Sequence, residues 1–102
     1  MSFKVKTITV FDRQAKRLIK KFPSLKKELQ TLIIELAEHH TQGTPIGNDC
    51  YKVRLAIASK SRGKAGGARV ITHVLFNDET AYLLSIYDKS EVDNISDKEV
   101  LE

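Results

Sequence analysis

The first third of the chain changes from strand-like alternation to helical spacing. The segment KVKTITV, residues 4–10, alternates polar and apolar side chains and is rich in β-branched residues, which is typical of a short strand. From Ala15 to Phe22 the apolar residues recur at helical spacing, which predicts an amphipathic helix with Asp12 as its N-cap. Pro23 ends this helix, because proline disfavours the helical conformation of the residue before it.

A second amphipathic helix follows almost at once. Ser24 is placed to cap it, and Gly43 is expected to end it. The apolar stripe of this helix consists of Leu25, Leu29, Leu32, Ile33 and Leu36. The segment TQGTPIGN, residues 41–48, has turn-forming composition and is expected to be loop. Because so few residues connect the two helices, we expect an antiparallel pair whose apolar stripes both face a sheet.

Three further strands are predicted in the second half of the chain. Their segments are CYKVRLAI at residues 50–57, RVITHVLF at 69–76 and AYLLSIYD at 81–88, the last two joined through the turn-like NDET. With the first strand this gives an α+β fold, in which a twisted antiparallel sheet of about four strands carries the helix pair on one face. The whole chain, residues 1–102, is expected to be one domain, and its end also allows a short C-terminal helix.

The helix pair can cover only one face of the sheet, and the other face is predicted to be basic. Strict alternation places these side chains on the uncovered face: Lys52, Arg54, Arg69 and Tyr87, with Lys89 following in the same phase. In the last strand Ser85 shares the direction of Tyr87, whereas Leu84 and Ile86 are expected to point the other way. The sequence therefore predicts an exposed basic surface with an aromatic ring on it.

Positive and negative charges are concentrated in different segments of the chain, although the net charge is only +4. Residues 1–27 carry nine Lys or Arg against Asp12 alone, and residues 52–69 carry six cations and no acid. Residues 28–51 hold four acids and no Lys or Arg, and residues 78–102 hold eight acids and two lysines. Clustered cations gain affinity by releasing counterions from phosphates, so the division indicates a polyanionic partner. For the first segment, a solvated basic helix face is an equal alternative.

A long basic segment joins two of the predicted strands, where a two-residue turn would suffice. This segment, SKSRGKAGGAR at residues 59–69, lacks the GxxxxGK[ST] spacing of a P-loop and no helix follows it. Its glycines permit backbone shapes that other residues resist. Since Lys60, Arg62 and Lys64 stand at the edge of the basic face, we expect an arm that binds RNA phosphates, rather than an inert hairpin loop.

The composition limits the classes of protein to which the chain can belong. Hydrophobic residues make up 41% and charged residues 29%, which is typical of a globular protein. No apolar run approaches the roughly 18 residues that a membrane span needs, and the start lacks a signal peptide pattern. Cys50 is the only cysteine, which leaves no internal disulfide and no thiolate metal cluster and fits a reducing cytoplasm. We expect Cys50 to be a small buried hydrophobe.

Three motifs keep a recognisable order along the chain. They are YKVRLA at residues 51–56, GKAGGARVI at 63–71 and IYDKSE at 86–91, preceded by a helix pair with FPSL at 22–25. In these motifs the chain resembles the RelE/HigB-like toxins of the RelE/ParE superfamily of bacterial toxin–antitoxin modules. The resemblance spans nearly the whole chain. It implies a small cytoplasmic toxin that cuts messenger RNA, often in the ribosomal A site, and is neutralised by a cognate antitoxin. The antitoxin is expected to be partly acidic and to cover the basic face or the helix pair.

The resemblance also implies a reaction that needs neither a metal nor a cofactor. The 2′-hydroxyl of the RNA attacks the neighbouring phosphate and gives a cyclic phosphate and a free 5′-hydroxyl. The protein must orient the 2′-oxygen in line, neutralise charge on the phosphorane and move two protons. Lys, Arg and Tyr side chains can do the first two, and crowding by other cations lowers the pKa of a lysine toward the range that a base needs.

The family's site residues can be carried over by position. Lys52 and Arg54 match the two basic residues of the family's second strand, and Arg69 matches the arginine assigned to the scissile phosphate. Lys89 matches the basic residue assigned to the leaving group. Arg54 stands where some members carry a lysine base, and arginine essentially never deprotonates. We therefore assign Arg54 to phosphate binding and Lys52 to the base, with the loop lysines 60 and 64 as substitutes.

Two aromatic residues need separate interpretation. The best-known members place a functional tyrosine beyond the last strand, and SEVDNISDKEVLE has none. Tyr87 could instead stack on a base or polarise the 2′-hydroxyl, with packing at a strand end as the alternative. His73 shares the ideal phase of Arg69 and is an acid–base candidate. Ile71 and Leu75 share that phase too, which favours a half-buried structural histidine.

Three functions therefore compete. The leading hypothesis is an endoribonuclease toxin (an mRNA interferase) of a type II toxin–antitoxin module. The first rival is a ParE-like toxin without enzymatic activity that binds a protein such as DNA gyrase, and the second is an RNA-binding module without catalysis. The predicted convergence of cations and a tyrosine on one face favours the nuclease, because a gyrase binder has no need of a phosphate site.

Overall fold

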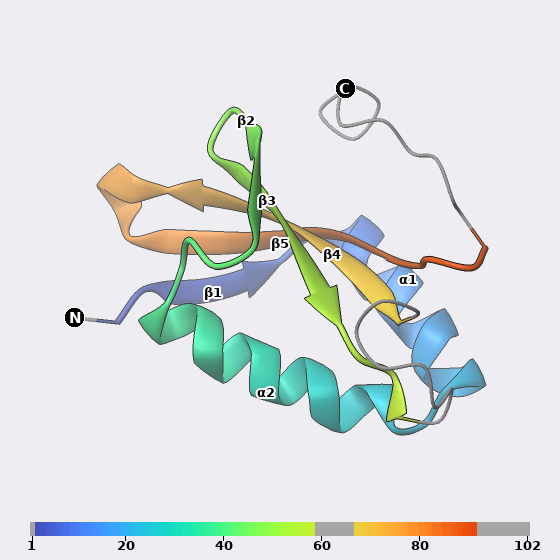
Figure 1. Cartoon of the computed structure of the whole chain (residues 1–102). Coiled ribbons are helices and arrows are strands. Elements are labelled where there is room, and N and C mark those ends of the chain that lie inside the picture. The colour runs from blue at the N-terminus through green and yellow to red at the C-terminus, as the bar shows by residue number, and fades with distance from the viewer. Residues whose placement is uncertain (1, 59–66, 92–102) are drawn as a thin grey trace.

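The computed structural model describes residues 2–58 and 67–91, whose arrangement is shown in Figure 1. The elements in chain order are β1 (Lys4–Thr7), α1 (Thr9–Lys21), α2 (Leu25–Glu38), β2 (Thr44–Gly47), β3 (Cys50–Leu55), β4 (Ala68–Leu75), a 3₁₀ turn (Phe76–Asp78) and β5 (Thr80–Asp88). The strands of these ranges form one sheet in the order β1-β5-β4-β3-β2. The predicted α+β class is confirmed. The C-terminal helix that the sequence allows would fall in residues 92–102, outside the described residues.

The sheet has five strands rather than about four, and it is mixed rather than antiparallel. β1 runs parallel to β5, so the prediction of a purely antiparallel sheet was wrong for this edge strand. The additional strand is β2, which lies in the segment expected to be loop and pairs antiparallel with β3. Asn48 and Asp49 connect β2 to β3 with φ of 52° and 59°, a left-handed turn that these residue types tolerate and that suits a tight hairpin.

α1 begins earlier than the sequence indicated. Its N-cap is Ile8 rather than Asp12, which lies in the first turn, where a carboxylate is favoured by the helix dipole. The reason is Phe11, which is only 3% exposed and continues the apolar stripe of Ala15 and Leu18 backward by one turn. Burial of this aromatic side chain outweighs the strand propensity of the preceding β-branched residues.

α2 buries the predicted stripe but ends before Gly43. Its last helical residue is Glu38, and Gly43 instead takes φ of +101° where the chain passes close to β3. A Cβ at this position would lie 2.7 Å from the Lys52 carbonyl oxygen and 3.0 Å from Val53 Cγ2. Glycine is therefore required here by a close approach of two backbones.

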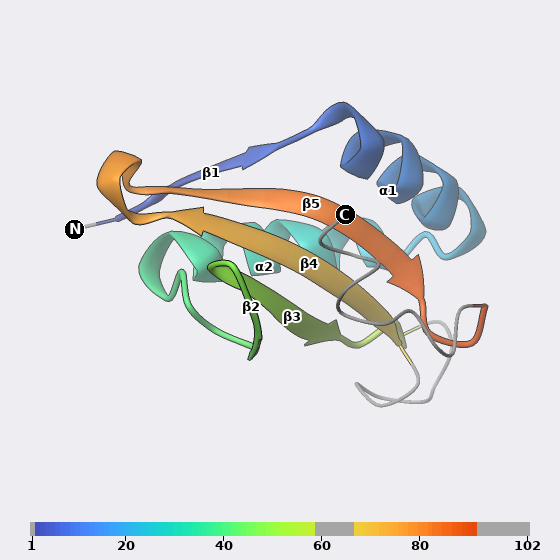
Figure 2. The ribbon, with the colours of Figure 1, turned by 90° about the horizontal axis from the view of Figure 1, so that it is seen from above.

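One hydrophobic core joins both helices to the sheet. Figure 1 shows α2 below the sheet, and Figure 2, seen from above, shows it passing beneath β4, with α1 on the β5 side. The buried members of this core are Phe11, Ala15, Leu18, Leu25, Leu29, Leu32, Leu36, Val53, Ile57, Ala68, Val70, Leu83 and Ile86. Both helices thus cover the same face of the sheet, as predicted. Neither has the length and apolar character that a membrane crossing requires within the described part of the chain.

A bulge in β5 changes which of its residues face the core. Ile71 of β4 pairs with Ser85, whereas the next residue, Thr72, pairs with Leu83, so Leu84 is the extra residue. An extra residue reverses the alternation of a strand. Leu83 and Ile86 therefore both join the core although they are three positions apart. The expectation that Leu84 accompanies Ile86 was wrong, because it assumed a strand without a bulge.

α1 covers the edge of β5 that β1 leaves open. β1 pairs only with residues 80–83 of β5, so the second half of that edge has no strand neighbour among the described residues. There the Oε1 of Gln14 accepts a hydrogen bond of 3.0 Å from the backbone N–H of Ile86. A helix side chain thus satisfies one backbone donor of this edge, and α1 lies where a further strand would otherwise pair.

Replacing Gln14 with leucine should destabilise the fold by removing this acceptor. We expect Gln14→Leu to lower the free energy of unfolding by about 1–2 kcal/mol, because the Ile86 N–H would stay largely buried without a partner. Gln14→Glu keeps an oxygen acceptor and should lose less. Equilibrium urea unfolding measures both, with Gln30→Leu at an exposed position of α2 as the control. Equal unfolding midpoints for Gln14→Leu and Gln30→Leu would contradict this role.

Candidate functional site

Three predicted site residues form a row across the three adjacent strands β3, β4 and β5. The register pairs Arg54 of β3 with Arg69 of β4, and Arg69 with Tyr87 of β5. Directly paired residues project from the same face of a sheet. The next residue of β4, Val70, belongs to the core on the helix side, so the row lies on the opposite face. We call these three residues the Arg–Arg–Tyr row.

The middle of this row is buried rather than exposed. Arg69 is only 5% exposed, while Arg54 is exposed and Tyr87 is half-buried. The Nη1 of Arg69 donates a hydrogen bond of 3.1 Å to the carbonyl oxygen of Ala68. The expectation of an exposed basic surface was therefore wrong for Arg69, because β4 is the central strand and is covered along most of its length.

The electrostatics of the row centre on Arg69. Burial and then the positive charge of Arg54 lower the pKa of the Arg69 guanidinium from its ordinary value, and the interaction with Tyr87 raises it in part. An arginine keeps its charge despite such a shift. The row thus holds a partly desolvated cation next to a second one. An anion placed between them would relieve the repulsion and would interact more strongly than in water.

Lys52 adjoins the row one pair further along β3. It pairs with Ile71, which in turn pairs with Ser85, and its spacing of two residues from Arg54 keeps it on the same face. A hollow of about 480 Å³ opens beside it. The residues that line this hollow are Gln42, Gly43, Thr44, Lys52, Val53 and Arg54. Its size falls within the range of small-ligand sites, so the row has room for a substrate at its β3 end.

Lys89 lies at the other end of the row, just beyond β5. Its side chain is exposed, and its backbone N–H donates a hydrogen bond of 3.1 Å to the Gly67 carbonyl oxygen. Gly67 in turn meets the end of β3, where an added Cβ would collide with the Leu55 carbonyl oxygen. The glycine lets three strand ends converge beside the row. This contact places the backbone of Lys89 next to Gly67, which lies two residues before Arg69 and immediately before β4.

The turn after β5 is held by its own side chains. The Oδ1 of Asp88 accepts hydrogen bonds from the backbone N–H of Ser90 at 3.0 Å and from its Oγ at 2.8 Å. Glu91 forms an ion pair with Arg17 of α1, with 3.3 Å between Oε1 and Nη2. These contacts hold residues 88–91 in place next to the row and against α1.

The family model described as "RelE toxin of RelE / RelB toxin-antitoxin system" matches residues 3–102. The chain belongs to the RelE toxin family. Several solved structures share the fold of this RelE-family toxin. An arginine-to-alanine mutant of the E. coli toxin RelE in the free state is 18% identical with a TM-score of 0.63, and the match covers 91% of this chain and 90% of that one.

Two further structures give similar values. A chain of the intact E. coli RelBE toxin–antitoxin complex is 17% identical with a TM-score of 0.57, covering 85% of this chain and 96% of that one. A metal-bound toxin from Helicobacter pylori is 18% identical with a TM-score of 0.56, covering 88% of this chain and 98% of that one. At such identities the matches show a shared fold, and the family model shows that this chain is a toxin of a toxin–antitoxin system.

The remaining predicted positions of this RelE-family toxin are the loop cations and His73. Lys60, Arg62 and Lys64 lie outside the described residues. His73 is half-buried, as expected, and pairs with Cys50, whose Sγ is 3.3 Å from His73 Nδ1. At about 3.3 Å per residue along β4, His73 lies roughly 13 Å from Arg69. The described residues contain no group of three or more His, Cys, Asp or Glu that could hold a metal ion.

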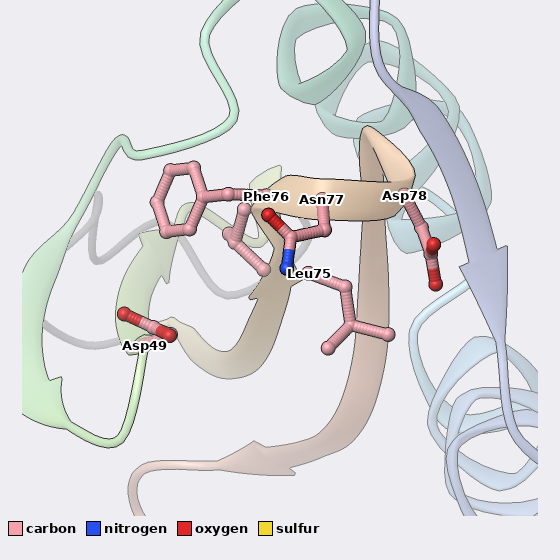
Figure 3. Close-up of a pocket in the computed structure, with 6 residues that line it drawn as sticks. Asp49, Leu75, Phe76, Asn77 and Asp78 are labelled. Carbon is pink, nitrogen blue, oxygen red and sulfur yellow. The ribbon is translucent and has the colours of Figure 1, made fainter.

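A second hollow lies at the opposite end of the sheet. Figure 3 shows it at the 3₁₀ turn, with the carboxylates of Asp49 and Asp78 on either side. Its volume is about 450 Å³, and it is lined by Asp49, Val74, Leu75, Phe76, Asn77 and Asp78. Two carboxylates without a cation disfavour a phosphate, so this hollow is not the candidate RNA site.

Sequence reasoning missed two parts of the site. It did not foresee the hollow beside Lys52. The available signal was Gly43, because a glycine in a loop can mark a place where the loop backbone lies against a strand, and here that contact forms one wall of the hollow. It also treated Arg69 as exposed. Its neighbours Ala68, Val70 and Ile71 are apolar, and such a continuous apolar context indicates a strand that is buried on both faces.

Cys50 should be unreactive in the folded protein, as its expected role of small buried hydrophobe implies. Burial and then the negative charge of Asp49 raise the pKa of its thiol, so the reactive thiolate is scarce at neutral pH. We expect the native protein to react with a thiol-specific disulfide reagent about tenfold or more slowly than the urea-unfolded chain. Cys50→Ser controls for background, and equal rates in both states would contradict the burial.

The raised pKa of the Cys50 thiol also determines the direction in which the stability of the fold changes with pH. Because the folded pKa of Cys50 is raised, its contribution to stability is complete below the ordinary thiol pKa and is lost as the pH rises through the folded value.

Proposed function

We propose that this RelE-family toxin is an endoribonuclease that cleaves messenger RNA by attack of the 2′-hydroxyl on the adjacent phosphate. The observation that carries the proposal is the Arg–Arg–Tyr row, in which a buried arginine lies between an exposed arginine and a tyrosine. Two adjacent guanidinium groups suit a phosphate, because arginine presents several donors in a planar fork. A toxin that only binds a protein partner gains nothing from a desolvated cation of this kind.

Each residue has a distinct part in the proposed reaction. Arg54 and Arg69 hold the scissile phosphate and neutralise the charge that develops on the phosphorane. Tyr87 stacks on a base or donates its hydroxyl toward the 2′-oxygen. Lys52, in its unprotonated form, takes the proton of the 2′-hydroxyl as the new O–P bond forms. Lys89, as an ammonium ion, gives a proton to the 5′-oxygen as the old P–O bond breaks.

The burial of Arg69 matters for the rate of cleavage as well as for binding of the phosphate. A cation held by the sheet and by the Ala68 carbonyl needs little reorganisation when the phosphate becomes more negative. Such preorganised groups stabilise the transition state more than the ground state, which is the condition for raising kcat. Arg54 is exposed and therefore suits capture of the phosphate on arrival.

The partners of the proposed nuclease follow from the family. One comparison structure is a RelBE toxin–antitoxin complex, and another is a RelE mutant bound to a RelBc antitoxin peptide. These two complexes support a cognate antitoxin for this chain, which we propose to be partly acidic and to cover the basic face or the helix pair. The messenger is proposed to be cut in the ribosomal A site in the cytoplasm.

Substitution of the row should abolish cleavage while the fold remains intact. In translation of a reporter message followed by mapping of 5′-hydroxyl ends, we expect Arg69→Ala to reduce cleavage by about 10²-fold or more. Arg54→Ala should also reduce it and, being an exposed position, tests the row without risk to the core. Lys4→Ala, an exposed cation on β1, is the matched control.

The outcomes of that experiment separate the competing functions. Cleavage by Arg69→Ala and Arg54→Ala at the rate of the original chain would contradict the proposed site. Inhibition of DNA supercoiling without any RNA cleavage would indicate the ParE-like alternative. RNA binding without either effect would indicate a binding module.

Lys52 can be tested as a base separately from phosphate binding. If it accepts the proton, Lys52→Ala should lower the single-turnover rate at saturating RNA by about 10²-fold or more and change RNA affinity little. If it only binds phosphate, affinity should fall while the saturating rate stays the same, and the assignment as base would be wrong. Single-turnover cleavage over a range of toxin concentrations distinguishes the two.

A further inference from the structure

The outer face of α1 carries a second concentration of cations. The exposed basic residues of this helix are Arg13, Lys16, Arg17, Lys20 and Lys21, and Asp12 is its only acid. The inner face packs on the core through Phe11, Ala15 and Leu18. Arg13, Lys16 and Lys20 are three and four residues apart and so share one line on the outer face. At about 1.5 Å rise per residue this line is roughly 10 Å long, and we call it the α1 cation stripe.

Within residues 2–58 and 67–91, no carboxylate forms an ion pair with the stripe. The ion pair that α1 does form belongs to Arg17, whose Nη2 lies 3.3 Å from the Oε1 of Glu91. This contact places the flank of α1 next to the end of β5. The stripe itself faces solvent, and three like charges at such spacing repel each other unless an anion lies against them.

The stripe is separate from the Arg–Arg–Tyr row. α1 and α2 cover one face of the sheet, and the row lies on the other. Figure 2 shows α1 along the β5 side of the sheet, away from β3, where the row begins at Arg54. A single phosphate cannot contact both, so the two surfaces need two different stretches of nucleic acid.

We infer that the α1 cation stripe binds the phosphate backbone of double-helical RNA. Single strands are usually held by aromatic rings on which bases stack, and the stripe offers none. Phe11 is buried in the core, and the ring of Phe22 is occupied by Lys21, whose Nζ lies 5.3 Å from its centre. A duplex, in contrast, is recognised largely through its phosphates and its shape, which needs only spaced cations.

A protein partner fits the stripe less well than RNA does. Protein interfaces depend on a buried apolar centre with a few large anchors. Among the described residues, no large apolar side chain is exposed between Arg13 and Lys20. The exposed ones lie one turn earlier, at Ile8 and Val10, or on other elements, at Ile34, Leu75 and Phe76. A protein partner would find those anchors on the first turn of α1, on α2 and at the end of β4, and the stripe would then contribute only charge.

The inference rests on the proposed function in one respect. The row takes the single strand to be cut, and the stripe holds a duplex region of the RNA assembly that presents this strand. Binding of a duplex can be measured without any cleavage, so the two proposals fail separately.

The test compares two double variants that remove the same charge. Lys16→Gln/Lys20→Gln alters the stripe, and Lys4→Gln/Lys27→Gln alters exposed lysines on β1 and α2. The probe is a fluorescent RNA hairpin with a long duplex stem, titrated at several salt concentrations. For the stripe variant we expect the slope of log K against log salt to fall by about 1 to 2, since each phosphate contact contributes somewhat less than one. The control should keep the slope of the original chain.

Three further arms decide the outcome. An unstructured RNA oligonucleotide should bind both variants alike, and so should polyglutamate. An equal loss in the stripe variant and the control would mean that only net charge matters, and would overturn the inference. A loss confined to the oligonucleotide or to polyglutamate would overturn it in favour of a single strand or an acidic protein. Arg69→Ala should keep hairpin binding, which separates the stripe from the proposed nuclease site.

Discussion

Strand β4 lies at the centre of the sheet and is paired with β3 on one side and β5 on the other. Its even-numbered residues Ala68 and Val70 face the helices, and Arg69 between them faces away. Because the side chains of a strand alternate, a slip of one residue would carry Arg69 into the core and expel its apolar neighbours. Burial of those neighbours therefore fixes the register, and the register fixes the position of the guanidinium. The alignment with Arg54 and Tyr87 is a consequence of the same constraint.

The two ends of β5 depend on different partners. β1 pairs with its first half, and α1 closes the second half through Gln14 and the core residues of the helix. The bulge at Leu84 lies between the half of β5 that pairs with β1 and the half that α1 covers. A bulge increases the local twist of a strand and redirects the residues that follow. Beyond it, Ser85 and Tyr87 face the cations while Ile86 faces the core, so the irregularity aligns the tyrosine with the row.

The row is costly for the fold and useful for chemistry. A buried arginine next to another arginine is destabilising by itself, as the direction of its pKa shift indicates. The apolar core beneath it offsets that cost, and natural proteins commonly give up stability at their functional sites. The cations of α1, in contrast to Arg69, are exposed. They remain in water, which weakens their mutual repulsion without removing it, and they attract an anionic partner at long range.

The sequence by itself determined the two helices, the three strands of the second half, the division of charge and the set of basic residues on one face. Each of these follows from local periodicity or composition, which need no knowledge of distant contacts. It also carried the motifs of the toxin family, which the family model confirmed. Tertiary structure alone decided the rest: the parallel pairing of β1, the strand β2, the bulge at Leu84 and the burial of Arg69. Those features depend on which segments meet in space. A period-two pattern cannot reveal an inserted residue, and a charged side chain does not reveal that its strand lies at the centre of a sheet.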